Sequence, residues 1–201
     1  MARYFKYPCP GCRSTNDLHD FDCKFTGTPW FDVEKAYTDV VGALADGAKT
    51  EEELRAVAHG DWDSLHQAAF QELRTTRRVD ETTDESGREV LELVTPDEYR
   101  ERLAHPPHDP VKTIYEEGSV PGAHDNSVFA MVAYYEMIGL TWAETKEKVV
   151  DWLKESGTWQ RGGFEEASPE ELVESKRHVH EQGYGWKEKA KAAKAVIDRR
   201  V

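Results

Sequence analysis

Three cysteines and one histidine near the N-terminus have the spacing of a metal site. The first pair lies in Cys9-Pro-Gly-Cys12, and His19 and Cys23 complete the pattern Cys-x2-Cys-x6-His-x3-Cys. Thiolate sulfur and imidazole nitrogen are ligands that zinc prefers, and four of them close a tetrahedral structural site. The pattern therefore predicts one zinc ion bound by Cys9, Cys12, His19 and Cys23, with no open coordination position for catalysis.

Two alternatives to this ligand set stay open. The cysteines could be unliganded thiols, because all three cysteines of the chain lie in this segment and an odd number cannot pair completely as disulfides. Asp17, Asp20 or Asp22 could also replace His19 as the fourth ligand. The ligand pairs are too close together for a full zinc ribbon, so residues 1–29 are expected to form a small motif that packs on the next domain.

The elements that would support this motif begin at Trp30. A first helix with one apolar face is expected to be capped by Asp32 and to end at Gly47. Thr50-Glu-Glu-Glu53 is a capping box for a short second helix. A third helix is expected from about Asp61 to Arg77, after Gly60, and residues 79–94 read as a hairpin with a turn at Gly87. The expected common core consists of Tyr37, Leu44, Leu54, Leu65, Leu73 and Leu91.

Three helices followed by a two-stranded wing resemble the winged helix-turn-helix family. The resemblance covers residues 30–94, and we expect the whole domain to span residues 30–104. It implies that the third helix enters the major groove of DNA. The residues that would contact DNA are Gln67, Gln71, Arg74, Arg77 and Arg78. The wing tip, residues 80–85, is acidic and would repel phosphate, so a protein-protein module is the alternative.

A proline-rich break at residues 105–110 opens a predicted linker, residues 105–125, before a helical bundle over residues 126–201. An apolar helix follows Asn126, and Gly139 ends it. Thr141 and Glu144 form the next capping box, and Pro169 occupies the first turn of a later helix. Short connections of this kind are typical of a bundle of three or four helices. The expected fold class is thus mainly α with one small β-hairpin.

The motifs of this last segment resemble the C-terminal helix-bundle module of archaeal and plasmid replication primases. The matching residues are Gly122 with Asp125-Asn126, Gly139-Leu140-Thr141 with Glu144, Trp152, Pro169-Glu-Glu-Leu172 and Gly183-Tyr-Gly-Trp186. Asp125 departs from the family, which has Arg before the Asn, and this weakens any phosphate contact by that loop. The resemblance implies binding of nucleic acid, with single-stranded or primed DNA as the expected partner.

Charge is distributed unevenly along the chain. The 201 residues carry a net charge of −13, whereas residues 175–201 carry eight bases against three acids, a net charge of +5. A basic tail on an acidic body favours a local contact with nucleic acid. The predicted contacts are Lys176, Arg177, Tyr184, Trp186, Lys187, Lys191 and Lys194. The alternative is that the two aromatic residues belong to the core and the lysines are solvated.

No motif of a common enzyme class is recognisable. The sequence lacks a P-loop, a dinucleotide-binding fingerprint, a nucleophile elbow and the paired carboxylates of a polymerase site, so no enzyme is predicted. It has no run of 18 apolar residues and no apolar signal region, so no membrane partner and a cytoplasmic location are expected. Its acidic composition is typical of halophilic archaeal proteins.

These observations favour a nucleic-acid-binding accessory factor of DNA replication that works with a replication enzyme such as a primase. One alternative is a zinc-containing winged-helix transcription regulator that dimerises through its C-terminal bundle. Another is a protein-interaction adaptor that does not touch nucleic acid. The sequence leaves the oligomeric state open.

Overall fold

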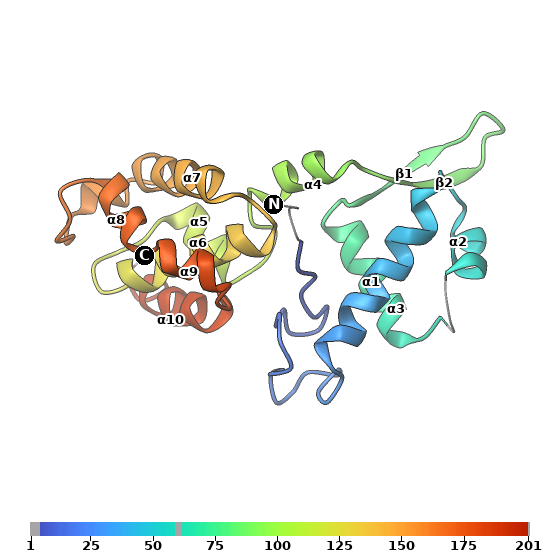
Figure 1. Cartoon of the computed structure of the whole chain (residues 1–201), viewed down its shortest axis with the longest axis horizontal. Helices are drawn as coiled ribbons and strands as arrows, with labels where there is room; N and C mark the ends of the chain where they lie inside the picture. The colour runs from blue at the N-terminus through green and yellow to red at the C-terminus, as the bar shows by residue number, and fades with distance from the viewer. Residues whose placement is uncertain (1–4, 59–61, 201) are drawn as a thin grey trace. The chain divides into compact units, whose positions relative to one another are not determined.

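Two compact units make up the chain (Figure 1). The computed structural model describes residues 5–58 and 62–200. The N-terminal unit is Lys6–Arg102 and the C-terminal unit starts at Leu103. Across the described ranges the fold is mainly helical with a two-stranded antiparallel hairpin, which confirms the predicted fold class. None of the helices in these ranges is long and apolar enough to cross a bilayer.

The N-terminal unit follows the predicted order of three helices and a hairpin. Its elements are α1 (Trp30–Ala45), α2 (Glu51–Val57), α3 (Ser64–Thr75), β1 (Val79–Thr83), β2 (Glu89–Leu93) and α4 (Pro96–Leu103). Thr50 and Glu53 form the expected capping box of α2, and the Asp63 carboxylate caps α3 by accepting from two backbone N–H groups. The predicted helix start at Asp61 and the break at Gly60 lie outside the described residues.

One core joins these elements. The six residues expected there, Tyr37, Leu44, Leu54, Leu65, Leu73 and Leu91, are all buried. Helix α1 contacts α2, α3 and β2, and the hairpin pairs Val79 with Leu93 in antiparallel register. A further antiparallel bridge joins Lys49, just before α2, to Leu91. The hairpin therefore belongs to the core of this unit through β2, while its turn at Asp84–Gly87 projects outward (Figure 1).

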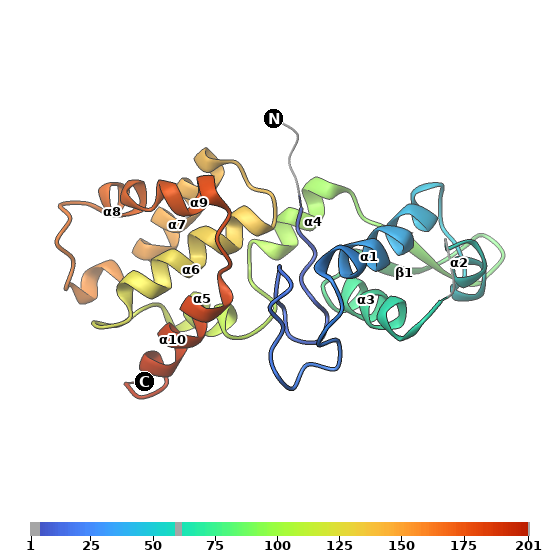
Figure 2. The ribbon, with the colours of Figure 1, turned by 60° about the horizontal axis from the view of Figure 1, so that its bottom comes forward.

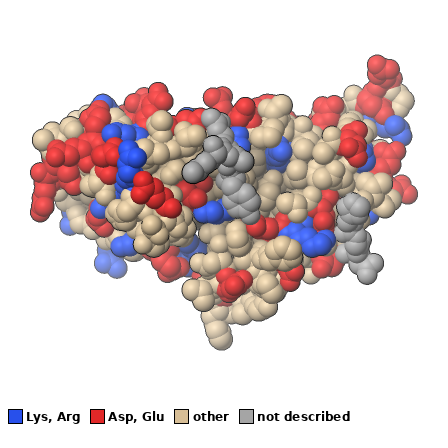
Figure 3. All heavy atoms as spheres, viewed as in Figure 1, with Lys and Arg blue, Asp and Glu red and all other residues tan. Residues whose placement is uncertain are grey.

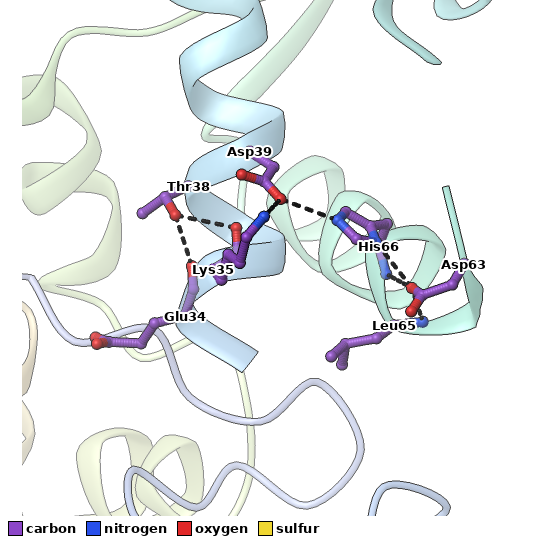
Figure 4. A network of polar contacts seen from close by, with 7 residues as sticks. All are labelled: Glu34, Lys35, Thr38, Asp39, Asp63, Leu65 and His66. Carbon is purple, nitrogen blue, oxygen red and sulfur yellow. Dashed lines mark hydrogen bonds and ion pairs between the residues drawn. The ribbon is translucent and has the colours of Figure 1, made fainter. Parts of the chain in front are cut away.

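A polar contact also joins α1 to α3 (Figure 4). The His66 ring places Nε2 3.2 Å from an Asp39 oxygen and Nδ1 2.8 Å from an Asp63 oxygen. Burial raises the pKa of Asp39, but hydrogen bonds from Lys35 and His66 outweigh burial and hold the pKa below its usual value. His66 is thus held between two carboxylates.

The C-terminal unit is a helical bundle. Its elements are α5 (Val111–Glu117), α6 (His124–Met137), α7 (Trp142–Glu155), a 3-10 turn (Trp159–Arg161), α8 (Pro169–Ser175), α9 (Arg177–Gln182) and α10 (Lys187–Ile197). Helix α5 lies inside the range predicted as a linker, and α6 starts at His124. The prediction that residues 105–125 form a linker is therefore corrected. Val111 and Ile114 are fully buried, and α5 packs on α6 and α10.

Helix α6 is the centre of this bundle. It contacts α5, α7, α9 and α10, and Figures 1 and 2 both place it between α7 and α10. Ten of its 14 residues are buried, because these neighbours cover most of its surface. The Tyr134 and Tyr135 hydroxyls donate to the carbonyl oxygens of Leu103 and Ala104, which satisfies two polar groups inside the core.

Candidate metal centre

The predicted zinc ligands converge in the N-terminal unit. Cys9, Cys12, His19 and Cys23 each offer one ligand atom, and these atoms all lie within 4.8 Å of one another. The three cysteines are buried and His19 is half-buried. None of the three aspartates considered as replacements for His19 belongs to this cluster. The Asp17 carboxylate accepts instead from the backbone N–H of Trp30, at 2.7 Å.

Three of the six distances between the ligand atoms match tetrahedral coordination, and all six are at most 4.8 Å. Typical Zn–S and Zn–N bond lengths place two sulfurs about 3.8 Å apart and a sulfur and a nitrogen about 3.6 Å apart in a tetrahedron. Cys9 Sγ lies 3.8 Å from Cys23 Sγ. His19 Nδ1 lies 3.5 Å from Cys12 Sγ and 3.7 Å from Cys23 Sγ. The four residues could therefore hold one metal ion.

Backbone turns aim the first pair of sulfurs at this point. Cys9 N–H donates to the Ser14 carbonyl at 2.8 Å, and Arg13 N–H donates to the Cys9 carbonyl at 2.7 Å. Arg13 has a φ of 64°, a left-handed conformation that closes the turn. At the second pair, Phe25 N–H points at Cys23 Sγ from 3.4 Å. Such N–H groups stabilise the negative charge of a thiolate.

A hydrogen bond from the ring nitrogen that faces away from the sulfurs orients His19. His19 Nε2 lies 2.9 Å from the Thr28 carbonyl oxygen, so this nitrogen donates and Nδ1 is left to face the sulfurs. A hydrogen bond of this kind fixes the tautomer of a metal-binding histidine. The loop is also tied to the helices, since Arg13 Nη1 pairs with Glu72 of α3 at 2.7 Å and Trp30 Nε1 donates to the Tyr7 carbonyl at 3.0 Å.

The thiols of the cluster differ in their pKa. Burial raises the pKa of Cys9 to about 12, and the neighbouring sulfurs of Cys12 and Cys23 add to the rise. Burial also opposes ionisation of Cys12, but hydrogen bonds from the backbone at Asp20 and Ser14 lower its pKa to about 7. A bound cation would favour the thiolate form of both residues.

The residues predicted to contact DNA in the N-terminal unit are mostly engaged within the protein. Gln67 Oε1 accepts from Arg55 and from Trp62, and Arg74 pairs with Glu81. Arg78 is buried and donates to the Val94 carbonyl, so its guanidinium does not face solvent. Gln71 and Arg77 are exposed, and Arg77 lies 3.9 Å from Asp80. These residues do not form a continuous basic face.

The predicted contacts of the C-terminal unit also divide into two groups. Trp186 is buried and its indole N–H points at Met137 Sδ, 3.0 Å away, so it is a core residue in this structure. Tyr184 keeps 49% of its surface exposed. The remaining predicted residues are basic: Lys176 pairs with Asp125, Arg177 with Glu174, Lys191 with Glu188 and Lys194 with Asp198, while Lys187 opens α10.

Three residues that the sequence did not single out surround Tyr184. The rings of Phe129 and His178 lie 5.9 Å and 6.5 Å from the Tyr184 ring, and Lys189 Nζ lies 5.4 Å from the centre of the Phe129 ring. We call Phe129, His178, Tyr184 and Lys189 the aromatic patch. Its members come from α6, α9, the loop after α9 and α10, so only a tertiary structure brings them together.

The fold and the cluster define a two-unit helical protein with a four-residue metal-binding geometry. A family model described as "Family of unknown function (DUF7474)" matches residues 3–200, and the chain therefore belongs to this family. No curated protein and no solved structure matches the chain.

Proposed function

We propose that the protein is a zinc-stabilised, nucleic-acid-binding accessory protein. In this proposal the N-terminal unit holds a structural zinc ion and the C-terminal unit contacts a single strand through the aromatic patch. No catalytic role is assigned to either unit. Zinc is favoured as the metal because three thiolates and one imidazole in a closed tetrahedral set are the donors of structural zinc sites.

The aromatic patch is the observation that carries the nucleic-acid proposal. Exposed aromatic rings beside cations offer stacking surfaces for unpaired bases, and such contacts tolerate any base. Tyr184 is half-exposed and has Phe129 and His178 as neighbours, and Lys189 lies over the Phe129 ring, where it could pair with a phosphate of a stacked strand. The surrounding residues 175–201 carry the net charge of +5, whereas residues 6–102 carry 22 acids against 12 bases. Charge therefore favours residues 175–201 of the C-terminal unit as the contact.

The C-terminal unit resembles the helix-bundle module of replication primases. This resemblance supports a role in DNA replication, with primed DNA as the natural ligand. A winged-helix regulator is the second candidate, favoured by the order α1–α2–α3–hairpin and by the bridge from Lys49 to Leu91. The two candidates differ in ligand. The regulator requires duplex DNA bound through α3, and the accessory factor requires a single strand or a primer junction.

Metal analysis tests the first half of the proposal. Protein purified without chelator is expected to contain about one zinc ion per chain, as a closed four-ligand site requires. A Cys9→Ser, Cys12→Ser double variant should lose this zinc. Full zinc occupancy in the double variant would refute the ligand assignment, and full occupancy by another metal would refute zinc.

Binding to a fluorescent oligothymidylate tests the second half. Replacing Tyr184 by Ser should weaken binding about five- to 150-fold, the equivalent of one stacked base, and Lys189→Glu should weaken it further at low salt. Phe31→Ser is the matched control, since Phe31 is an exposed aromatic residue of the other unit, with 72% of its surface accessible. Equal affinity of wild type and Tyr184→Ser would exclude the patch, and preference for duplex DNA would favour the regulator.

A further inference from the structure

The loop that carries the metal ligands turns two large apolar side chains toward solvent. Phe21 is 100% exposed and Leu18 is 79% exposed, although both lie between the buried ligands Cys12 and Cys23. Residues other than Lys, Arg, Asp and Glu make up most of the surface that these N-terminal loops form in Figure 3. Burying one side chain of this size would contribute about 1.5–3 kcal/mol, which the fold of the chain leaves unused. We call Leu18 and Phe21 the loop anchor.

Hydrogen bonds hold the loop backbone on both sides of the anchor residues. Ser14 Oγ donates to the Leu18 carbonyl at 2.8 Å, and Leu18 N–H donates to Asn16 Oδ1 at 2.8 Å. On the other side of Phe21, Cys23 N–H donates to the Asp20 carbonyl at 3.0 Å. The backbone that carries both side chains is thus ordered by these bonds, which reduces the backbone entropy lost when a partner binds.

The charges around the anchor restrict the kind of partner. Asp20 and Asp22 flank Phe21, Asp17 precedes Leu18, and the N-terminal unit as a whole carries 22 acids against 12 bases. The one base beside them, Lys24, lies over the Phe25 ring at 4.7 Å. A nucleic acid, an anionic membrane or the same loop of a second copy would all bring negative charge against this rim. A surface rich in Lys and Arg would be attracted to it.

We propose that the loop anchor docks into an apolar pocket rimmed by Lys and Arg on a partner protein. Leu18 and Phe21 would fill the pocket, and the aspartates would pair with its rim. The two parts have different roles, because buried aromatic anchors supply most of the affinity and rim charges mainly speed association. This docking is independent of the nucleic-acid contact, which uses the other unit.

A photo-crosslinker at the anchor identifies the partner. The full-length, metal-loaded protein with p-benzoylphenylalanine at position 21 is added to an extract of the native host and irradiated. The same residue at position 57 is the control, since Val57 is an exposed apolar residue of the same unit, 48% accessible. A protein captured from position 21 and not from position 57 is then purified, and its crosslinked residues are mapped.

Affinity measurements with the purified partner decide the proposal. The Leu18→Ser, Phe21→Ser variant should bind at least tenfold more weakly, as expected for a hot-spot aromatic residue, while Val57→Ser should bind like wild type. Asp20→Asn, Asp22→Asn should reduce the association rate and its dependence on salt. Metal content and melting temperature should stay unchanged in all variants, because the replaced side chains are exposed, except for the half-buried Asp20, and none of them belongs to the ligand cluster.

Several results would overturn the proposal. They are equal capture from positions 21 and 57, unchanged affinity of the double serine variant, a crosslinked surface without Lys or Arg, and capture of a second copy of this chain. A captured nucleic acid would overturn it as well.

Discussion

Gly11 supports the metal cluster without contributing a ligand atom. A Cβ placed on this residue would lie 2.9 Å from Cys23 Sγ, closer than such atoms approach in proteins, and 3.2 Å from the Phe25 ring, which is a tight contact. The first turn of the motif can therefore reach the second pair of ligands only if position 11 has no side chain. This requirement is steric, since it comes from the nearness of the sulfur to the backbone.

We expect Gly11→Ala to weaken metal binding by roughly 10- to 100-fold, the range found when residues supporting a metal site are changed. The added methyl group would push Cys23 Sγ away from the other ligands. Competition with a chromogenic chelator measures this change. Gly42→Ala is the matched control: Gly42 lies in α1 with open space around its Cβ position, so alanine should stabilise the helix by up to about 1 kcal/mol. Equal metal affinity of wild type and Gly11→Ala would contradict the steric argument.

A second residue of interest is His124, at the start of α6. Its Nδ1 lies 3.0 Å from Ser119 Oγ and its Nε2 3.0 Å from the Gly162 carbonyl oxygen, and its ring packs on Phe164. Burial lowers the pKa of His124, the hydrogen bond to Gly162 partly offsets this, and Arg161 lowers the pKa further. The neutral ring is therefore the form that fits this site.

The stability of the C-terminal unit should depend on pH through His124. Because the folded-state pKa lies below the unfolded value of about 6.5, the unfolded state binds more protons between the two values. Stability is then fully present above pH 6.5 and falls as the pH drops toward the folded pKa. Thermal unfolding followed between pH 8 and pH 5 measures this loss, and His124→Gln should reduce the slope. The same slope in both proteins would show that other groups cause it.

The sequence predicted which four residues cluster but not their surroundings. Cys9, Cys12, His19 and Cys23 lie within one short segment, and their spacing alone predicted a common site. The Thr28 carbonyl that orients His19 is a backbone atom, which no sequence pattern marks. The aromatic patch joins Phe129 to Tyr184 across three helices, so its composition depends on how the bundle packs.

At the scale of elements, local sequence signals were sufficient to predict where a helix begins when its own N-terminal residues cap it. The boxes at Thr50 and Thr141 form as predicted, with both reciprocal hydrogen bonds. The segment before α6 was misjudged because its prolines suggested a break, while the short helix α5 that follows them has only a few helical residues. A helix of this length is stabilised by tertiary packing, here of Val111 and Ile114, and therefore leaves a weak sequence signal.

Packing of α3 against α1 provides the next prediction. Leu73 is completely buried on α3, so Leu73→Ala should lower the free energy of unfolding of the N-terminal unit by about 2–5 kcal/mol. Leu18→Ala is the control on the same unit, because Leu18 is 79% exposed and its truncation should cost less than about 0.5 kcal/mol. Urea unfolding followed by circular dichroism measures both. Similar losses in the two variants would contradict the assigned core.

At the scale of the whole molecule, the two units differ in how they are stabilised. The C-terminal unit has a continuous apolar core around α6. The N-terminal unit combines a smaller helical core with a long segment, residues 6–28, that contains no helix or strand among its described residues. This segment is anchored by the ligand cluster, by the Arg13–Glu72 pair and by stacking of Tyr7 on Tyr37 at 4.6 Å. Metal binding should therefore affect the two units unequally.

Removal of the metal provides the last prediction. A ligand that binds only the folded state stabilises it, so chelation should destabilise the N-terminal unit and leave the C-terminal unit unchanged. Hydrogen exchange followed by mass spectrometry separates the two. After chelation, residues 6–28 should lose nearly all protection, and α1 and α3 should exchange faster because Arg13 and Tyr7 no longer hold the loop against them. Peptides from α6 and α7 should exchange at the same rate with and without metal, and so serve as the internal control. Faster exchange in both units, or in neither, would contradict a structural metal centre confined to the N-terminal unit.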